Sequence, residues 1–192
     1  MDEISFWTTA LSTNDIRDNM CQRLTGTESG LLQYYRFDHS SGTSLVDLSG
    51  NSIHGTLNHM DNADWVLSGA ALGDDSAFDY TGTTASDFTA SLSFADGDRF
   101  TATGDSGTYT GIHVYLVNES PNTTTIPINY SSMDTDHYYG VFPVGITPTY
   151  SVAYNYSANT SEDDRLDNNS DVENCDSHSC LNCVFSCCDI FK

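Results

Sequence analysis

Turn-forming residue pairs recur at short intervals along most of this 192-residue chain, and this feature constrains its fold more than any other. The segments between the pairs are rich in β-branched and aromatic residues, as in SDFTASLSF, DRFTATG, GIHVYLV, HYYGVFPV and TPTYSVAYNY. Short strands separated by turns predict an all-β fold, with antiparallel strands forming a jelly roll or β-sandwich. The turn pairs are Ser41-Gly42, Gly50-Asn51, Ser68-Gly69, Thr81-Gly82, Asp96-Gly97, Ser106-Gly107 and Val144-Gly145. Within FADGDRF, the Asp-Gly pair predicts a β-hairpin.

One helix is expected, near the N-terminus. Residues 12–26 read STNDIRDNMCQRLTG, in which Ser12 is placed as the N-cap and Asp15 follows three residues later. Gly26 is the expected helix stop. The apolar positions recur at helical spacing, at Ile16, Met20 and Leu24. The preceding segment, DEISFW, alternates polar and apolar residues and predicts a strand.

The charge excludes two classes of partner. The chain has 27 acidic and 6 basic residues, which gives a formal net charge of −21. Such a charge repels nucleic acid phosphates and anionic membranes, so neither is expected as a partner. No segment approaches the roughly 18 apolar residues that a membrane span needs, so no membrane insertion is expected. The opening MDEISFW lacks the features of a signal peptide and resembles an interior cut of a longer chain.

The turn DLSGN, residues 47–51, is the best candidate for a binding site. Asp47 and Asn51 lie four residues apart around Gly50, which permits a tight bend. A carboxylate, an amide oxygen and backbone carbonyls converging in such a bend suit a hard cation such as calcium. Asp and Asn are also ordinary turn residues, because their side chains bond to their own backbone. Both interpretations remain open at this point.

Two segments resemble parts of one known family, the laminin G-like, concanavalin A-type jelly-roll modules. Residues 30–57, GLLQYYRFDHSSGTSLVDLSGNSIHGTL, followed by Trp65, resemble the opening strands of such a module. The matching positions are Tyr35, Arg36, Phe37, Gly42, Thr43, Asp47, Ser49, Gly50, Asn51 and Gly55. Residues 1–20, MDEISFWTTALSTNDIRDNM, resemble the last strand and trailing helix of one. In the family, the Asp of the closing strand and the Asp-x-Ser-Gly-Asn turn can lie together around calcium.

The resemblance implies four regions and a calcium site. Residues 1–28 would end one module, 29–72 would begin a second, 73–156 would form a small β-sandwich-like domain, and 157–192 would be a disordered acidic tail. The calcium ligands would come from Asp47, Gly50, Asn51 and Asp2, with Asp38 as a further source of oxygen. Asp2 and Asp47 would then belong to different modules. The segment after residue 73 resembles the β-rich part that follows such half-modules in large bacterial surface proteins, which implies an extracellular or cell-surface location.

No catalytic residues are expected. The five glutamates do not form the Glu-x-Asp-x-x-Glu pattern of concanavalin A-like glycosidases, and neither Gly-x-Ser-x-Gly nor His-Glu-x-x-His occurs. His54 and His113 are expected to be exposed, the first in the turn and the second on the outer face of a strand. The tail has cysteines suited to zinc, although they can equally cross-link or oxidise: Cys180, Cys183, Cys187 and Cys188, with His178 nearby.

The sequence therefore predicts a non-catalytic part of a secreted or cell-surface protein. Its expected role is adhesion or carbohydrate binding, with calcium as a candidate cofactor and an extracellular glycan or surface glycoprotein as the partner. One alternative is a substrate-binding accessory region of a polysaccharide-degrading enzyme. Another is a structural spacer that binds no ligand. A glycan itself cannot be named from the sequence, because jelly-roll sites are built on variable loops.

Overall fold

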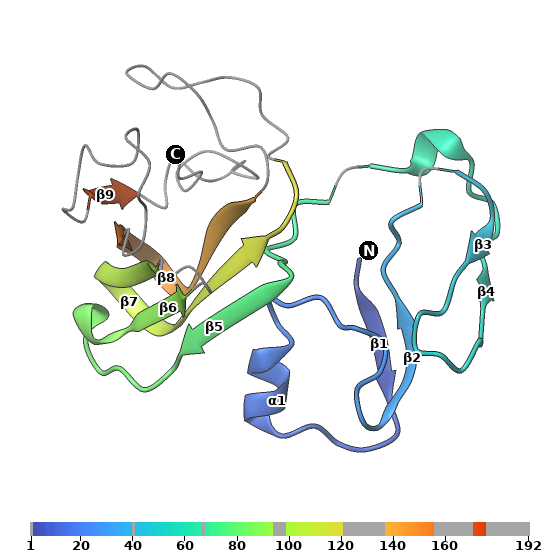
Figure 1. Ribbon diagram of the computed structural model, residues 1–192, viewed down its shortest axis with the longest axis horizontal. Helices are drawn as coiled ribbons and strands as arrows, with labels where there is room; N and C mark the ends of the chain where they lie inside the picture. Colours follow the sequence, from blue (N-terminus) through green and yellow to red (C-terminus); the bar gives the residue numbers. More distant parts are fainter. Residues whose placement is uncertain are drawn as a thin grey trace, which may run out of the picture. The chain divides into compact units, whose positions relative to one another are not determined.

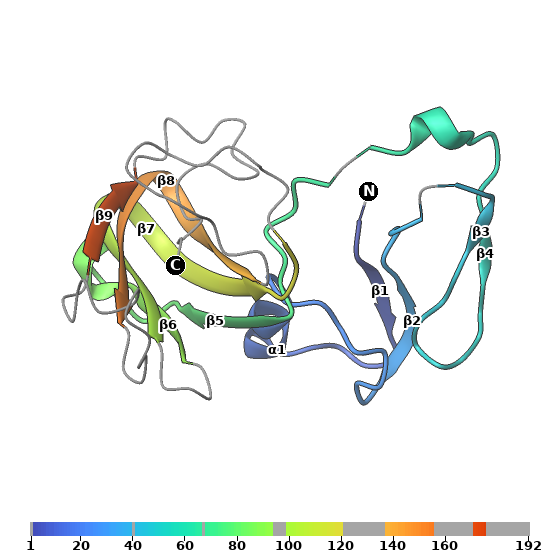
Figure 2. The same ribbon diagram turned by 45° about the horizontal axis from the view of Figure 1, so that its top comes forward.

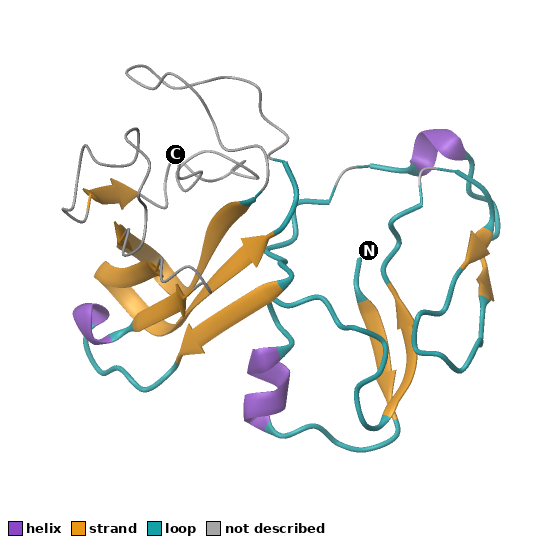
Figure 3. Cartoon of the chain, viewed as in Figure 1, coloured by secondary structure: helices purple, strands orange, loops and turns teal. Residues whose placement is uncertain are grey.

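The computed structural model describes residues 2–39, 41–66, 68–93, 99–120 and 137–155, and the backbone of a strand at 171–175. Strands dominate these residues, and every strand pair is antiparallel (Figure 3). The helical elements of the described part are one short α-helix, α1 (Thr13–Asp18), and two 3₁₀ turns, η1 (Asn62–Asp64) and η2 (Ala85–Asp87). The predicted antiparallel, mostly β character with one short N-terminal helix is confirmed. The described strands do not show the connectivity of a jelly roll.

The chain divides into two compact units. The first unit contains Met1–Asn19 and Arg23–Ala70. In it, β1 (Ile4–Trp7) pairs with β2 (Leu31–Tyr35), so that Ile4 lies opposite Tyr35. A second small ladder joins β3 (Ser44–Leu45) to β4 (Gly55–Thr56). The boundary expected between residues 28 and 29 therefore falls between two paired strands of one unit, because β1 has its backbone partner in β2.

The helix α1 is shorter than the sequence predicted. Its N-cap is as expected: Ser12 Oγ accepts a hydrogen bond from Asp15 N (3.2 Å), and Asp15 Oδ2 accepts one from Ser12 N (2.9 Å). However, the helix ends at Asp18, and none of its residues is buried. Ile16 is 52% exposed. The predicted apolar face is thus not a packing face, and Met20 belongs to the second unit.

The second unit contains Met20–Gln22 and Ala71–Lys192 and is built on one five-stranded sheet (Figure 1). The sheet order is β5 (Asp75–Asp79), β7 (Arg99–Val117), β8 (Tyr138–Asn155) and β9 (Asp171–Cys175), and β6 (Thr89–Ser93) also pairs with β7. β6 pairs with the first part of β7 and β5 with the last part. The predicted hairpin is present as the β6–β7 pair, with Ser93 opposite Arg99. Its turn lies outside the described residues.

Two predicted turns are instead irregularities inside long strands. Ser106-Gly107 lies within β7 and Val144-Gly145 within β8, and the ladder between these strands shifts register at Gly104/Ser106, Ser106/Thr108 and Tyr109/Gly111. The glycines permit a close approach of the two backbones. A Cβ on Gly145 would lie 1.9 Å from Thr108 O, and one on Gly107 would lie 2.2 Å from Thr147 O. Glycine in a strand interior often marks a bulge or a close backbone approach.

The hydrophobic core of the second unit is enclosed by one bent sheet. Figure 2 shows β7 and β8 as strongly curved ribbons. The core side chains come from β7, β8, β6 and the residue before β6: Phe88, Ala90, Leu92, Phe100, Ala102, Tyr109, Ile112, Val114, Leu116, Tyr139, Tyr150, Val152 and Tyr154. The small β-sandwich-like domain expected for 73–156 is not confirmed, because the described strands of this unit form one sheet. The irregular centre of the β7–β8 ladder lets a single sheet curve around the core.

Within the predicted disordered tail, the structure describes one strand. β9 pairs with the end of β8, from Tyr150 opposite Cys175 to Tyr154 opposite Asp171. The remainder of 157–192, including the cysteines considered for zinc, lies outside the described residues. No helix among the described residues has the length and apolar character needed to cross a membrane.

Candidate functional site

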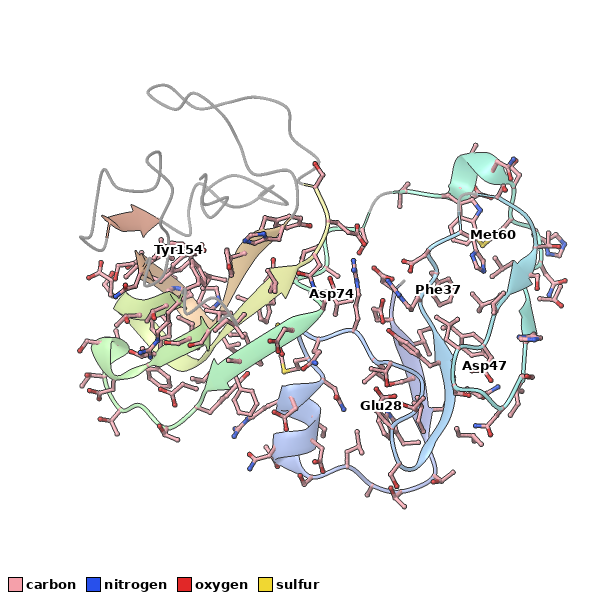
Figure 4. All side chains as sticks on the ribbon, in the orientation of Figure 1. Glu28, Phe37, Asp47, Met60, Asp74 and Tyr154 are labelled. Carbon is pink, nitrogen blue, oxygen red and sulfur yellow. The ribbon has the colours of Figure 1, made fainter. Side chains whose placement is uncertain are left out.

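The carboxylate of Asp47 is surrounded by hydrogen-bond donors. Asp47 is 5% exposed, just beyond β3 (Figure 4). Its Oδ1 accepts from the backbone N–H groups of Tyr34 and Ser49, each at 2.9 Å. Its Oδ2 accepts from the Ser49 hydroxyl and from the Ile53 N–H, also at 2.9 Å. The Asp47 side chain thus links the start of the turn to Tyr34 in β2 and to Ile53 at the end of the turn.

These four donors fill the hydrogen-bonding positions of the Asp47 carboxylate. A carboxylate has about four lone-pair positions, two on each oxygen, and four donors occupy them here. The N–H and O–H groups also direct their positive ends toward the carboxylate, where a cation would need negative partners. Calcium binding by Asp47 stays a prediction, and in this structure four hydrogen bonds from neutral donors stabilise its charge. Burial favours a higher pKa for Asp47, but the donors outweigh it and lower the pKa to about 2.

Gly50 and Asn51 also serve the turn. Gly50 has φ +79°, a conformation that glycine adopts without strain. The Asn51 side-chain nitrogen donates to Leu32 O at 3.0 Å and to Leu31 O at 3.4 Å. It is thus the amide's donor group that faces β2. These residues fasten the turn to the neighbouring strand, and a cation-binding arrangement of their oxygens is not observed.

Asp2 lies in a different group of residues. One ligand atom from each of Asp2, Glu3 and Asp38 can be chosen so that the three atoms lie within 4.8 Å of one another. We call these residues the acidic triad. The antiparallel pairing of β1 with β2 brings them together, because the residues before Ile4 then meet those after Tyr35. Asp38 was expected as a source of oxygen. Glu3 was not among the ligands predicted from the sequence. The one feature of the sequence that points to it is its position next to Asp2 at the start of a strand.

Hydrogen bonds and one cation already occupy part of the acidic triad. Arg36 Nε lies 2.8 Å from Asp38 Oδ2, in ion-pair contact but without hydrogen-bond geometry, and 3.6 Å from Glu3 Oε1. Glu3 Oε2 accepts the hydroxyl of Tyr34, and Asp2 Oδ1 accepts the N–H of Glu3. The pKa of Glu3 is raised, mainly by burial, although Tyr34 and Arg36 act in the opposite direction. One arginine is not sufficient to neutralise three carboxylates.

The two histidines differ from expectation in their contacts. His113 is fully buried, whereas an exposed outer-face position was predicted. Its Nε2 lies 2.8 Å from Tyr80 Oη, and the rings of Phe78 and Phe142, from the strands on either side, are 5.6 and 6.2 Å away. Aromatic side chains therefore cover the outer face of this sheet. His54 is exposed as predicted, but its ring also accepts a hydrogen bond from the turn.

Comparison with known proteins identifies no relative: no family model, no curated protein and no solved structure matches this chain.

Proposed function

We propose that this chain is a non-catalytic part of a secreted or cell-surface protein that serves adhesion or carbohydrate binding, with calcium bound at the acidic triad. A laminin G-like, jelly-roll origin of the first unit forms part of the proposal. The observation that carries it is the convergence of Asp2, Glu3 and Asp38, with ligand atoms within 4.8 Å of one another.

The donor chemistry of the acidic triad fits calcium. Calcium binds carboxylate oxygens at about 2.3–2.6 Å, so two oxygens on one ion lie at most about 5 Å apart. Each carboxylate also has one oxygen outside the hydrogen bonds and the 2.8 Å ion pair described above: Asp2 Oδ2, Glu3 Oε1 and Asp38 Oδ1. A divalent ion would balance the charge that Arg36 leaves. The ion would fasten the start of β1 to the end of β2 and thereby stiffen the unit.

The chemistry of two carboxylates, Asp47 and Glu3, supports the proposed non-catalytic role. Asp47 holds four donors, and its pKa of about 2 makes it a poor proton carrier near neutral pH. Glu3 has a raised pKa, but Tyr34 occupies one of its oxygens and Arg36 lies near the other. Both carboxylates are engaged in holding strands together, which suits a binding or structural module.

A calcium titration tests the cation site. Calcium added to the metal-free protein should raise its melting temperature, and Asp2→Asn together with Asp38→Asn should remove most of the increase. Asp75→Asn is the matched control, because Asp75 is exposed on β5 in the other unit and bonds to its neighbour Ser76 N. An equal calcium response in the double variant and the control would contradict the site. Binding to a panel of immobilised glycans tests recognition separately, and no binding in either calcium state would favour the structural spacer.

A further inference from the structure

Three successive rows of the sheet in the second unit carry aromatic side chains on the same face. Opposite residues of an antiparallel ladder share a face, and residues two apart along a strand do so as well. Strands β5, β7 and β8 are neighbours in this sheet (Figure 1). Their ladders and ring contacts place five residues together, which we call the aromatic face: Phe78, Tyr80, His113, Tyr115 and Phe142. Its rows are two residues apart, so the three rows span about 13 Å.

Two tyrosine rings of the aromatic face lie flat against glycines. A Cβ on Gly111 would lie 2.3–2.6 Å from three adjacent ring atoms of Tyr80. A Cβ on Gly140 would lie 2.1–2.5 Å from three adjacent atoms of the Tyr115 phenol group. A point this close to three adjacent atoms lies above the plane of a ring and not beyond its edge. One side of each ring therefore covers a glycine, while the other side is turned away from the sheet. Both tyrosines are partly exposed.

Contacts within the aromatic face hold its rings in place. The Tyr80 hydroxyl lies 2.8 Å from Nε2 of the buried His113, and the Phe78 and Tyr80 rings pack edge to face with their centroids 5.8 Å apart. Phe142 packs on the other side of His113 and is 38% exposed. Side chains that are already ordered lose little conformational entropy when a ligand binds. The aromatic face is therefore a preorganised surface.

The aromatic face and the positions around it are uncharged apart from the histidine. The outward positions of these three rows contain no carboxylate, lysine or arginine: Ser76, Phe78, Tyr80, Gly111, His113, Tyr115, Gly140, Phe142 and Val144. The whole chain carries a formal net charge of −21, which repels anionic ligands. A cationic ligand would find no carboxylate among these positions. The charge distribution therefore favours a neutral ligand.

We propose that the aromatic face binds a neutral glycan chain of β-linked glucose-type units. In such a unit the hydroxyl groups are equatorial, so both faces of the sugar ring present C–H groups. These positively polarised hydrogens pack on the negative face of an aromatic ring. The span of about 13 Å exceeds the width of one sugar ring, so the site suits a chain and not a single sugar. The inference rests on the carbohydrate-binding part of the proposed function, but it involves no residue of the acidic triad.

Calorimetric titration with cellohexaose, a neutral chain of six β-linked glucose units, tests the aromatic face. The unmodified protein should bind it equally well in calcium and in EDTA. Phe142→Leu should weaken binding about five-fold, because leucine fills space but presents no ring face, whereas Phe142→Tyr should keep it. Phe6→Leu is the matched control, because Phe6 is 50% exposed and lies on β1 in the first unit. The corresponding hexamer of β-linked glucuronic acid should bind much more weakly at low salt, because its carboxylates are repelled.

Two results would overturn the aromatic face as a glycan site. One is equal affinity for cellohexaose in Phe142→Leu and the unmodified protein, which would leave carbohydrate binding itself standing. The other is no binding of cellohexaose to the unmodified protein. Binding of other glycans on the panel would then keep the proposed function, and no binding of any glycan would remove both. Self-association of the protein that is lost in Phe142→Leu, without glycan binding, would assign the face to a second copy of the chain.

Discussion

The rings of Phe100 and Tyr139 stack with their centroids 4.6 Å apart, although they come from opposite ends of the β7–β8 ladder. Phe100 lies opposite Tyr154, and Tyr139 lies opposite Leu116, sixteen residues further along β7. A straight strand of that length would separate them by about 50 Å. The sheet must therefore bend back on itself to bring them together. Their contact closes the core of the second unit.

Replacing Phe100 by alanine should destabilise the second unit strongly. Phe100 is 0% exposed, and the loss of its ring leaves a cavity against Tyr139 and Tyr154, so the expected cost is about 3–5 kcal/mol. Urea denaturation followed by tyrosine fluorescence measures it. Phe142→Ala is the matched control, since Phe142 is 38% exposed and should cost clearly less. Similar losses in the two variants would show that the bent sheet does not depend on the Phe100 contact.

Asp47→Asn should destabilise the first unit without any metal present. The asparagine side chain keeps one acceptor oxygen, so its NH₂ group must face the Ile53 N–H or one of the other donors. One unsatisfied group of this kind costs about 1–3 kcal/mol. Chemical denaturation in a chelating buffer is the measurement, with Asp75→Asn as the control. If Asp47→Asn kept normal stability in chelator but lost a calcium-induced increase, the turn would be a cation site after all.

Asp47 should contribute to the loss of folding stability at acidic pH. Its pKa in the folded protein is about 2, below the usual 3.8 of an aspartate. A group with a depressed pKa stabilises the fold above its unfolded pKa, and that contribution is lost as the pH falls from near 4 toward 2. Stability measured across this interval should therefore decline less steeply in Asp47→Asn than in the unmodified protein. Parallel curves would contradict the donor arrangement around this carboxylate.

Glu3 should show the opposite pH dependence. Its pKa in the folded protein is raised above 4.5, with burial as the largest cause. The folded state then holds the Glu3 proton more tightly than the unfolded state, so this contribution to stability is lost as the pH rises from 4.5 through the raised pKa. In calcium-free buffer, Glu3→Gln should lose less stability than the unmodified protein over this range. An unchanged slope in Glu3→Gln would argue against the burial of this carboxyl group.

Gly145→Ala should be far more disruptive than Gly55→Ala. A Cβ at residue 145 would lie 1.9 Å from the Thr108 carbonyl oxygen, a backbone atom that cannot move without disturbing the β7–β8 ladder. At Gly55 the nearest atom would be the Leu45 side chain at 3.4 Å, an ordinary contact. We expect the first substitution to cost at least about 2 kcal/mol in thermal or urea unfolding. Equal effects at the two sites would show that the backbones of β7 and β8 do not approach closely at Gly145.

Local sequence rules predicted the elements whose partners are near in the chain. The Ser12–Asp15 capping box is one, because a serine hydroxyl and a carboxylate three residues later satisfy the first free N–H groups of any helix. The β6–β7 hairpin is another, since an Asp-Gly pair suits a short reversal. The strand content followed from β-branched and aromatic composition, which favours an extended backbone over helix.

The candidate sites depended on long-range partners that no local pattern specifies. DLSGN suits a cation-binding bend and a hydrogen-bonded bend equally well, and the Tyr34 N–H, thirteen residues before Asp47, helps to fill its carboxylate. The acidic triad has a similar origin, since Asp2 and Asp38 meet only because β1 pairs with β2. The sequence showed which oxygens were available, but strand pairing determined which of them met.

The sequence by itself determined that the chain is mostly antiparallel β structure, with a capped helix near its start, because those features arise from contacts within a few residues. The tertiary structure decided that Gly107 lies at a register shift and Gly145 at a close backbone approach, both within continuous strands, and that His113 is buried. A glycine permits a turn or a close approach equally well, and a histidine flanked by apolar residues suits an exposed or a covered sheet face. Only the neighbours brought in from distant segments, Thr108 and Thr147 for the glycines and Phe78 and Phe142 for the histidine, select between these alternatives.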